Sequence, residues 1–523
     1  MTSADPPFGR VLVANRGEIA VRIIRACHEL GMESVAVYSD ADRDARHVQL
    51  ADIAVRLGPA PASESYLRID AVVDAARSTG AEAIHPGYGF LSERSAFARA
   101  VEEAGIVFVG PPPGVIDAIG DKARARAVAR SVGVETVPGS IEPVRTDRPD
   151  LLDAIVVEAG RIGFPLLVKA AAGGGGRGMR RVASAAELPA ALAAGSAEAA
   201  SAFGDGTVYL EREIRPARHV EVQLLGDTTG RIIAIGERDC SLQRRHQKLI
   251  EEAPAPGLSA DSRRALHAMA VRLGEASGLR NAATAEFLGA PDGMFYFLEV
   301  NTRLQVEHGV TELVAGLDIV HEQFRLAAGA PLSAAALAAA DRASEPDGHA
   351  IEVRLSAEDP SRDFAPTPGR IRRWIMPAGP GVRIDTGMGL GDRVPPEYDN
   401  LVAKILVHAP DRDGAIDRLR GALDETEIAG IQTTLPFDRF VVRHAGFRAG
   451  DLSTDWVADQ WDGPAERGRY AGAAAKAAAR ALVDGVPALG DPGPSVPERP
   501  AQAAPGDGWG AAARADAIDR WPR

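Results

Sequence analysis

The sequence predicts a multidomain protein of mixed α/β and α+β class, because its 523 residues are too many for one compact core. Residues 10–39 begin with the apolar run VLVA, pass through a polar turn and a helical pattern, and end in the apolar run SVAVYS. This βαβ order predicts an open α/β domain at the N-terminus. Residues 349–450 show a separate mixed α/β pattern, which predicts a second domain near the C-terminus.

We divide the chain into an N-terminal domain (1–120), a central domain (121–330), a C-terminal domain (331–462) and a tail (463–523). Within the central domain, residues at about 131–204 predict a small inserted lid, since a strand, a glycine run, an alanine-rich helix and another strand follow one another. The tail is rich in Ala, Pro and Gly. We expect it to contain short helices joined by a flexible linker.

Composition excludes several classes of protein. The net charge of -13 leaves no basic block to neutralise nucleic-acid phosphates. Only two cysteines are present, Cys27 and Cys240, so we expect no disulfide framework and a reducing compartment. The N-terminus has no apolar signal segment, and no apolar run approaches the roughly 20 residues that span a bilayer. We therefore expect a cytoplasmic protein that binds neither nucleic acid nor membrane.

Lysine is rare in this chain, although 59 residues are basic. Arginine fills nearly every position where a surface cation would serve, so each lysine calls for a reason. The compact ammonium suits phosphate oxygens in narrow sites better than the wide guanidinium does. Chance retention would explain any single lysine, but three of the five fall in the motifs described below: Lys122, Lys169, Lys248, Lys404 and Lys476.

A glycine run, KAAAGGGGRGM, follows the apolar strand that ends at Lys169. Glycine lets main-chain N–H groups turn toward a phosphate, and Lys169 and Arg177 add positive charge. The run does not end in G-K-[ST], so it is not a Walker A loop. Glycines alone would also fit a flexible surface loop. Their position directly after a strand ending in a rare lysine favours binding of nucleotide phosphate.

The segment 284–308 predicts a β-hairpin with its turn at Asp292-Gly293. This register places Glu286 opposite Glu299, and Asn301 on the same face. Two adjacent carboxylates repel each other unless a proton or a cation lies between them. Three oxygen ligands suit Mg²⁺ bound together with phosphates. Carboxylates turned into water are the alternative, but the apolar run FYFLEV around Glu299 disfavours it.

Beyond the hairpin, polar residues alternate too far along the chain for one straight strand to bring them into a small site. We expect the chain to leave the sheet near Thr302 and to curl, so that Arg303, Gln305 and Glu307 surround one ligand. An arginine, an amide and a carboxylate form a suitable pocket for a small planar oxyanion such as bicarbonate, with the carboxylate as base. A solvated edge strand is the alternative.

A third cluster, ERDCSLQRRHQKLIEEAPAP, concentrates basic residues in an acidic protein and would attract small anions. Lys248 and His246 are the preferred ligand contacts. We expect Cys240 to be a buried small residue rather than a nucleophile. One or two of the cluster's arginines are expected to pair with nearby acids, for which the candidates are Asp239, Glu251 and Glu252.

Seven motifs together resemble the biotin carboxylase component, the alpha-type subunit, of biotin-dependent acyl-CoA carboxylases in the ATP-grasp superfamily. They are VANRGEIAVRIIRA, IHPGYGFLSE, GDKARAR, GGGGRGM, RDCSLQRRHQK, NTRLQVEH and HAIEVRLSAEDP. The resemblance runs from about residue 8 to about residue 450. It implies a pre-ATP-grasp N-terminal domain, an ATP-grasp domain with a mobile lid that closes on ATP, and a mixed α/β C-terminal domain.

The resemblance also implies roles for individual residues. It assigns ATP binding to Lys122, Lys169, Gly175, Gly176, Glu211, His219, Gln243, His246, Glu286, Leu288 and Glu299. The implied ligands of Mg²⁺ (or Mn²⁺) are Glu286, Glu299 and Asn301. Bicarbonate and biotin are assigned to Lys248, Arg303, Gln305, the backbone of Val306, and Arg354. Among these Lys248, Arg303 and Arg354 act in catalysis, where Arg354 stabilises the biotin enolate, and Glu307 removes the proton from bicarbonate.

The implied reaction is carboxylation of biotin with ATP and bicarbonate through carboxyphosphate, the first half-reaction of an acetyl- or propionyl-CoA type carboxylase. A biotin-carrying lysine would be flanked by methionines near the C-terminus, whereas Lys476 lies in AAAKAAA. We therefore expect a homodimer, with biotin on a separate carrier protein and with a separate carboxyltransferase subunit. Another ATP-grasp carboxylate–amine ligase and a catalytically silent scaffold are the alternatives. The segment HAIEVRLSAEDP disfavours the first, and retention of the charged site residues disfavours the second.

Four positions depart from the family pattern without removing a catalytic side chain. They are Arg94, Ala172, Ala283 and Gly309, which replaces the proline after QVEH. They bear on the flexibility of the lid and on the geometry after His308.

Overall fold

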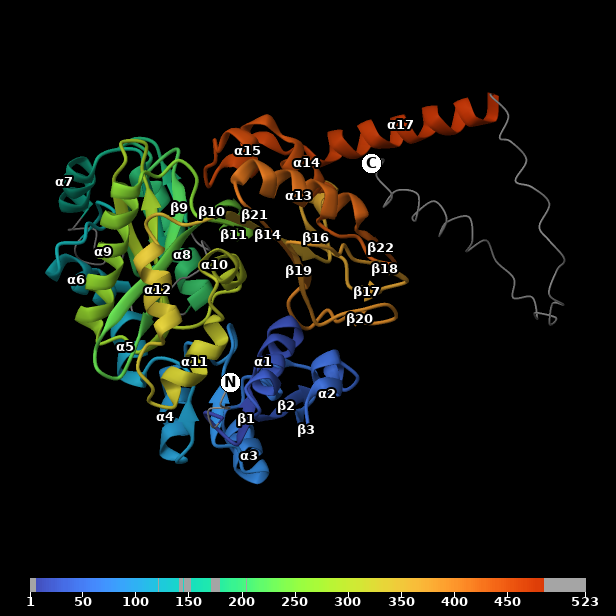
Figure 1. Cartoon of the computed structure of the whole chain (residues 1–523). Coiled ribbons are helices and arrows are strands. Elements are labelled where there is room, and N and C mark those ends of the chain that lie inside the picture. Colours follow the sequence, from blue (N-terminus) through green and yellow to red (C-terminus); the bar gives the residue numbers. More distant parts are fainter. Residues whose placement is uncertain are drawn as a thin grey trace.

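Three parts of the chain surround a common centre in the computed structural model, which describes residues 6–483 except 121, 141–143, 145–151, 171–178 and 204. Figure 1 shows the N-terminal part in blue, the central part in green and yellow, and the C-terminal part in orange. A parallel sheet lies in the first part, and antiparallel sheets lie in the others. The predicted multidomain α/β and α+β class is confirmed.

The N-terminal part is an open parallel sheet with helical connections, as its βαβ pattern predicts. Its strands, in sheet order, are β3 (Ile53–Gly58), β2 (Glu33–Ser39), β1 (Arg10–Val13), β4 (Ala83–His85) and β5 (Val107–Phe108). The connecting helices are α1 (Gly17–Glu29), α2 (Arg46–Leu50), α3 (Ile69–Thr79) and α4 (Ser95–Glu103). The central strands are buried on both faces, so they read as continuous apolar runs.

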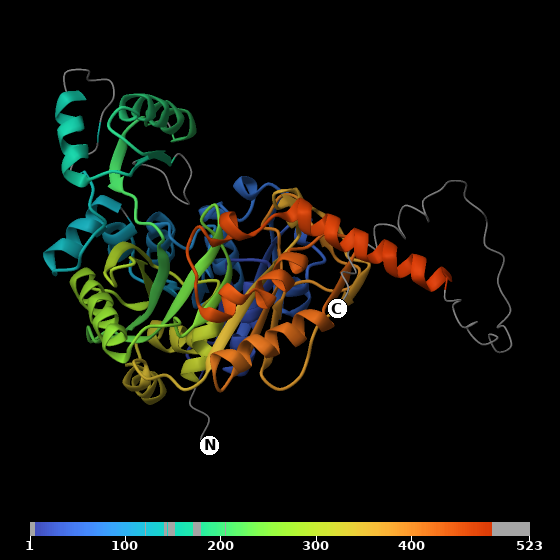
Figure 2. The same ribbon diagram turned by 90° about the horizontal axis from the view of Figure 1, so that it is seen from above.

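The predicted lid region contains a small antiparallel sheet in the order β7-β6-β8 with its own apolar cluster. Figure 2 shows this region projecting from the rest of the chain. Its elements are α7 (Leu152–Ile162), β6 (Leu166–Ala170), β7 (Arg180–Val182), α8 (Leu188–Phe203) and β8 (Val208–Arg212). The glycine run after β6 lies outside the described residues. Helices α5 (Pro113–Gly120) and α6 (Lys122–Ser131) lead from the N-terminal part toward the lid region.

A single antiparallel sheet of eight strands joins the central and C-terminal parts, because β11 pairs with β14. In sheet order its strands are β13 (Phe295–Asn301), β12 (Asn281–Gly289), β9 (Arg218–Gly226), β10 (Ile232–Arg244), β11 (Gln247–Ala253), β14 (His349–Ser356), β21 (Leu401–Ala409) and β19 (Val382–Thr386). The chain segments on either side of residue 331 therefore share one rigid backbone layer, and the sequence pattern alone did not reveal this.

Several helices pack against this sheet. Along the chain, α9 (Ala260–Ser277) connects β11 to β12. The connection from β13 to β14 contains α10 (His308–Ala315), α11 (Ile319–Ala327) and α12 (Ala334–Arg342). The C-terminal part adds α13 (Arg412–Glu425), α14 (Leu435–Arg443), α15 (Ala445–Ala449) and α16 (Trp456–Gln460). Its short strands are β15 (Glu358–Asp359), β16 (Ala365–Pro366), β17 (Gly369–Arg370), β18 (Arg373–Ile375), β20 (Arg393–Val394) and β22 (Glu427–Ala429).

The described part of the tail is one helix, α17 (Gly463–Val483), which projects from the C-terminal part in Figures 1 and 2. The predicted linker and last helix lie outside the described residues. Among the helices of the described ranges, none has the length and apolarity needed to cross a membrane.

A shared apolar core holds the N-terminal part against the central part. Phe324 of α11 is fully buried in a cluster that also contains Val11 and Ile23, and its ring meets the ring of His85 edge to face at 5.3 Å. Replacing Phe324 by alanine removes this contact and leaves a cavity, so we expect the unfolding free energy to fall by about 3–5 kcal/mol.

Urea denaturation measured by circular dichroism checks this expectation. Leu390→Ala is the matched control, because Leu390 is 68% exposed and its truncation is expected to cost less than about 0.5 kcal/mol. Equal unfolding midpoints for the two variants would contradict the shared core.

Candidate active site

A row of charged side chains crosses four neighbouring strands of the large sheet. Arg238 of β10 lies opposite Glu221 of β9, and Glu221 lies opposite Glu286 of β12. Glu286 is in turn opposite Glu299 of β13, as the hairpin register predicted. The chain turns at Asp292-Gly293, where Gly293 takes the left-handed conformation with φ +84°. Residues that lie directly opposite share one face of a sheet, so four charges meet on that face.

Lys248 of β11 neutralises much of this row. Its Nζ atom donates to Oε2 of Glu221 (2.5 Å) and to Oε1 of Glu286 (3.0 Å). It also donates to Oε1 of Glu307 (2.7 Å), which comes from a different segment. Burial alone would lower the pKa of Lys248, but the three carboxylates outweigh burial and raise it well above its ordinary value. The ammonium is therefore charged throughout the neutral range.

The predicted curl after the hairpin is present. Strand β13 ends at Asn301, and the chain reaches helix α10 at His308 without further strand pairing. Within the curl, Arg303 donates to Oε1 of Gln305 (2.8 Å) and lies 3.1 Å from Glu93 of the N-terminal part. The amide of Gln305 donates to Glu286 (3.0 Å). Arg303 and Gln305 thus lie together, and Arg303 also interacts electrostatically with Glu307, but the carboxylates that they contact directly are Glu93 and Glu286.

Arg354 of β14 reaches the same place from the C-terminal part. It donates to Oε2 of Glu307 (2.8 Å) and to Oε1 of Glu251 (2.5 Å). Burial opposes ionisation of Glu307, but Lys248 and Arg354 outweigh it and hold the pKa of Glu307 well below its ordinary value. Burial raises the pKa of Glu251 to about 7, although Arg354 acts in the opposite direction. Glu307 and Glu251 both accept hydrogen bonds from Arg354, but their pKa values are shifted in opposite directions, so Glu251 is the more easily protonated of the two.

The predicted metal ligands lie close to one another. Glu286 and Asn301 are in contact, since the amide of Asn301 donates to Oε1 of Glu286 (2.9 Å). Glu299 is half-buried on the neighbouring strand, directly opposite Glu286. Carboxylate and amide oxygens are the ligands that Mg²⁺ prefers, so this set of donors fits the ion. Glu286 also accepts from Lys248, so cation binding there would replace existing contacts.

The residues predicted to contact ATP occupy two places. On the lid region, Lys169 of β6 pairs with Glu211 of β8, and Arg126 of α6 contacts the same carboxylate. On the large sheet, Nε2 of His219 lies 3.0 Å from Oε2 of Glu286, and Leu288 is directly opposite His219.

Two further predicted ATP contacts lie on the β10–β11 hairpin. Gln243 is buried and opposite Lys248, whereas His246 is exposed at the tip with φ +66°. Lys122 begins α6, but its side chain lies outside the described residues, as do Gly175 and Gly176.

Several site residues were not predicted from the sequence. Glu221 is fully buried at the centre of the charged row, and its signal was a single acid inside the apolar strand HVEVQLLG. Glu251 was expected only as a structural partner of the basic cluster. The acids expected to pair with that cluster's arginines were wrong: Arg238 pairs with Glu221, whereas Arg244 and Arg245 pair with Asp363. Asp239, Glu251 and Glu252 pair instead with Arg218, Arg354 and Arg412. Asp363 lies 119 residues beyond Arg244 in the chain, directly after the short 3₁₀ helix Pro360–Arg362.

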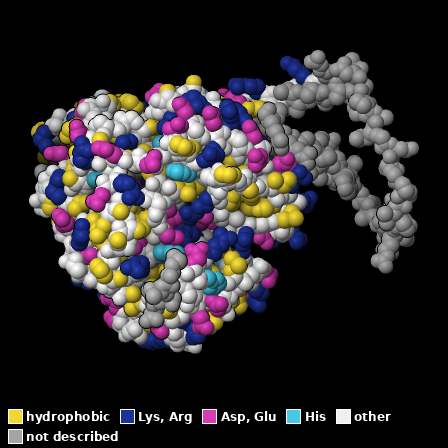
Figure 3. All heavy atoms as spheres, viewed as in Figure 1, with side chains coloured by type: hydrophobic (Ala, Val, Ile, Leu, Met, Phe, Trp, Pro, Cys, Tyr) yellow, Lys and Arg dark blue, Asp and Glu magenta, His cyan; other side chains and the backbone are white. Residues whose placement is uncertain are grey.

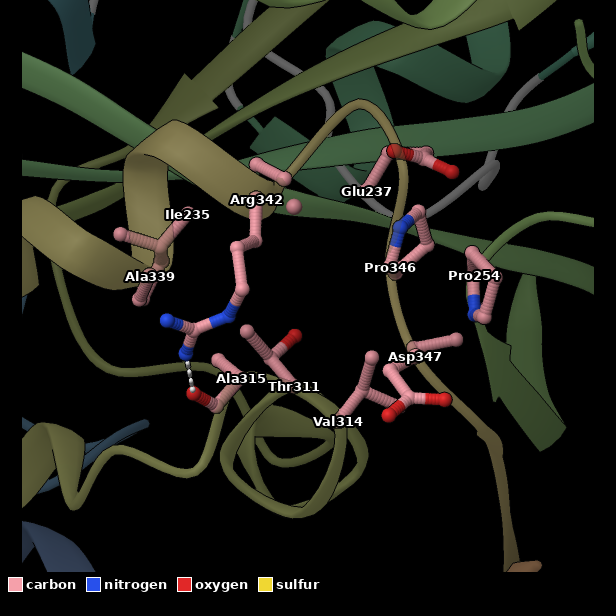
Figure 4. A pocket seen from close by; sticks show the side chains of 13 residues that line it. Ile235, Glu237, Pro254, Thr311, Val314, Ala315, Ala339, Arg342, Pro346 and Asp347 are labelled. Carbon is pink, nitrogen blue, oxygen red and sulfur yellow. Dashed lines mark hydrogen bonds between the residues drawn. The ribbon is translucent and has the colours of Figure 1, made fainter. Parts of the chain in front are cut away.

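Charged groups of both signs gather in a hollow near the middle of the face that Figure 3 shows. A separate pocket, seen in Figure 4, lies between β10, β11, α10 and α12 and has an empty volume of about 390 Å³. Its wall includes Thr311, whose hydroxyl accepts from Arg238 (2.8 Å), and Arg342, which donates to the carbonyl of Ala315 (3.3 Å). Its described lining contains none of the residues predicted to bind ATP, metal or bicarbonate.

The small three-stranded lid sheet, the acidic hairpin and the cation cluster on the large sheet define a protein of the ATP-grasp superfamily. Residues 7–116 match the family described as "Biotin carboxylase, N-terminal domain", and residues 352–459 match "Biotin carboxylase C-terminal domain". Residues 121–335 match "Carbamoyl-phosphate synthase L chain, ATP binding domain". The chain belongs to the biotin carboxylase family.

Individual relatives agree with this membership. The chain is 49% identical to a biotin carboxylase of Pseudomonas aeruginosa over 448 residues, which cover 86% of this chain and 97% of the relative. It is 45% identical to a propionyl-CoA carboxylase alpha chain of Ruegeria pomeroyi, covering 87% and 68% of the two chains. The solved biotin carboxylase domain dimer of Hydrogenobacter thermophilus 2-oxoglutarate carboxylase, in complex with MgADP, ADP and bicarbonate, has a TM-score of 0.81 at 44% identity. The match covers 86% of this chain and 97% of the Hydrogenobacter chain.

The raised pKa of Glu251 predicts a pH-dependent contribution to stability. Its pKa is about 7 in the folded chain against an ordinary value of 4.5, so the folded state holds a proton that the unfolded state releases between these values. Stability from this group is complete below pH 4.5 and is lost as the pH rises to 7. The loss is at most about 3 kcal/mol.

Glu251→Gln replaces the titrating carboxyl group with an amide. The decline in urea midpoint between pH 4.5 and 7 should therefore become flatter. Glu103→Gln, an exposed change at the end of α4, controls for the loss of a surface carboxylate. If Glu251→Gln and wild type show the same slope with pH, Glu251 does not titrate in this range.

Proposed function

We propose that this chain is an ATP-dependent ligase that carboxylates biotin with bicarbonate by way of carboxyphosphate. The observation that carries the proposal is the convergence of Lys248, Glu307 and Arg354 on one point of the sheet, beside the acid pair of the β12–β13 hairpin. Lys248 and Arg354 keep the base Glu307 ionised, and the acid pair Glu286 and Glu299 beside it can bind a cation. These groups are the ones needed to activate a small oxyanion with a nucleotide.

Nucleotide binding involves two surfaces in this proposal. Lys169, Glu211 and the glycine run act from the lid region, while His219, Gln243, His246 and Leu288 act from the large sheet. Glu286, Glu299 and Asn301 would hold Mg²⁺, which neutralises phosphate charge when bound. Movement of the lid region toward the sheet would exclude water, to which carboxyphosphate is sensitive.

Bicarbonate binds in the curl. The donors come from the guanidinium of Arg303, the amide of Gln305, the ammonium of Lys248 and the backbone of Val306, and Glu307 lies next to Val306 and in contact with Lys248. Glu307 is fully buried and ionised, so it can accept the bicarbonate proton without first losing its own. Its present partners, Lys248 and Arg354, then become available to the substrate anion and to the transferring phosphoryl group.

Arg354 serves the second half of the reaction. Its guanidinium lies beside the base but comes from a different strand, so it can face biotin while Lys248 faces bicarbonate. Positive charge at this position stabilises the enolate oxygen that develops when the ureido nitrogen of biotin loses its proton.

Replacing Glu307 by glutamine tests the assignment of the base. Glutamine keeps the size of the side chain but cannot accept the proton, so we expect bicarbonate-dependent ATP hydrolysis to fall by about 10²–10⁴-fold. The assay measures phosphate release with and without bicarbonate, and with free biotin as the acceptor. The affinity for Mg·ADP should change by less than about threefold, because Glu307 lies outside the proposed nucleotide contacts.

Glu103→Gln is the matched control and should retain wild-type activity. A wild-type chain that hydrolyses ATP equally well without bicarbonate would point to another ATP-grasp ligase. A chain that binds Mg·ADP but never hydrolyses ATP would point to a scaffold.

Replacing Glu299 by alanine tests the metal ligands. One of three oxygen donors is lost while Glu286 and Asn301 remain, so the Mg²⁺ concentration for half-maximal activity should rise about tenfold or more. Titration of activity with MgCl₂ at fixed ATP measures the shift, and Glu103→Ala supplies the control. An unchanged requirement for Mg²⁺ would remove Glu299 from the metal site.

The relatives support an inference about the partners of this chain. A dimer is known for the biotin carboxylase domain of the Hydrogenobacter protein, and a propionyl-CoA carboxylase alpha chain is among the relatives. We infer a homodimer that acts on biotin carried by a separate carrier protein. A separate carboxyltransferase subunit then passes the carboxyl group to an acyl-CoA of the acetyl or propionyl type.

A further inference from the structure

We propose that Lys404 is a positioning residue that fixes the peptide between Val306 and Glu307, and thereby sets the place of the base against bicarbonate. Lys404 touches no proposed substrate. It lies on β21 of the C-terminal part, about a hundred residues after the base. The inference rests on the proposed function for its meaning in catalysis, but the contact itself does not depend on it.

The environment of Lys404 explains why this lysine is retained in an arginine-rich chain. Its side chain is fully buried, and Nζ donates to the carbonyl oxygen of Val306 at 2.7 Å. Three carboxylates surround the ammonium, at 3.4 Å for Glu18, 3.7 Å for Asp385 and 4.0 Å for Glu352. A buried ammonium is costly unless it is paired and hydrogen-bonded, and here both conditions are met. Of these four contacts, the one to Val306 is the shortest, and it is directed at the curl.

The curl needs such an anchor because it lies outside the sheet. After β13 ends at Asn301, the pairing of this segment with β12 stops, so the sheet no longer holds the carbonyl groups that follow. The carbonyl of Gln305 accepts from the ring of His308 (2.8 Å), and the carbonyl of Val306 accepts from Lys404. A hydrogen bond to the Val306 carbonyl fixes the peptide plane that precedes Glu307. That plane fixes where the main chain of Glu307 begins, and the contacts with Lys248 and Arg354 then fix its carboxylate.

The sheet register shows that the base is held from two adjacent strands. Lys404 lies directly opposite Arg354 of β14 and directly opposite Asp385 of β19. Arg354 binds the carboxylate of Glu307, whereas Lys404 binds the main chain just before it. Two cations side by side would repel each other, and the surrounding carboxylates make the arrangement tolerable. The C-terminal part therefore contacts both the carboxylate of Glu307 and the carbonyl of Val306 just before it.

Lys404 also connects the base to the N-terminal part. Glu18 of α1 approaches the ammonium and accepts a hydrogen bond from the hydroxyl of Tyr88. Lys404 thus lies where all three parts of the chain meet. A change in how the N-terminal part packs would be transmitted to the Val306–Glu307 peptide through one side chain.

The test compares Lys404→Met with Lys476→Met, a matched change at an exposed lysine of α17. Lys404→Met keeps the length of the side chain but loses the donor and the charge. We expect KM for bicarbonate to rise about tenfold or more and kcat to fall, while the affinity for Mg·ADP stays within about twofold. Lys404→Arg retains a donor and a charge, and it should recover part of the activity. Lys476→Met should behave as wild type.

Hydrogen exchange measured by mass spectrometry tests the contact without any substrate. Residues 302–309 should exchange faster in Lys404→Met than in wild type or Lys476→Met. If the single variant folds poorly, Lys404→Met combined with Glu18→Gln removes one unpaired carboxylate and is used in its place. Unchanged exchange in this segment, or equal losses of Mg·ADP and bicarbonate binding, would overturn the proposal. A wild-type chain without bicarbonate-dependent activity would refute the proposed function, while the exchange result would still decide whether Lys404 anchors the curl.

Discussion

The site depends on one electrostatic constraint: Glu221, Glu286 and Glu307 meet within reach of a single ammonium group. Buried carboxylates repel each other strongly, and Lys248 donates to all three. Lys248 outweighs burial and lowers the pKa of Glu286, and together with Arg354 it lowers the pKa of Glu307, whereas burial and the neighbouring Glu307 raise the pKa of Glu221. Two arginines add further positive charge, because Arg238 pairs with Glu221 and Arg354 pairs with Glu307. Charges that are already paired and oriented need little rearrangement when an anionic substrate replaces one partner, which is the basis of electrostatic preorganisation.

The eight-stranded sheet is what brings these charges together. Glu286 and Glu299 come from the hairpin at one edge, whereas Lys248 lies on the central strand β11 and Arg354 on β14. Antiparallel pairing fixes the relative height of each side chain, and a shift by one residue would turn every charge to the opposite face. Placing Lys248, Arg354, Glu286 and Glu299 on paired strands rather than on loops keeps these cations and metal ligands in a constant geometry, and the base Glu307 is held from outside the sheet by its contacts with Lys248 and Arg354.

Local patterns predicted the parts of the site that lie close together in sequence. The hairpin register and the curl after Thr302 follow from alternation and from the length of a strand, and both are present. The contacts of Glu221, Glu251 and Asp363 could not be predicted in the same way, because their partners depend on strand order across the sheet. Alternation states which face a side chain occupies, but it does not state which strand lies beside it.

Gly309 illustrates how a departure from the family pattern is accommodated. A β-carbon at this position of α10 would lie 2.4 Å from Cδ2 of Leu406, a fully buried residue of β21. Glycine therefore allows the start of α10 to rest directly on β21, two residues from Lys404. Because the curl is anchored from β21 through Val306, close packing of α10 on the same strand preserves the position of Glu307 without the proline that the family pattern has there. Glycine at position 309 thus changes how the start of α10 packs on β21, while Glu307 keeps its contacts with Lys248 and Arg354.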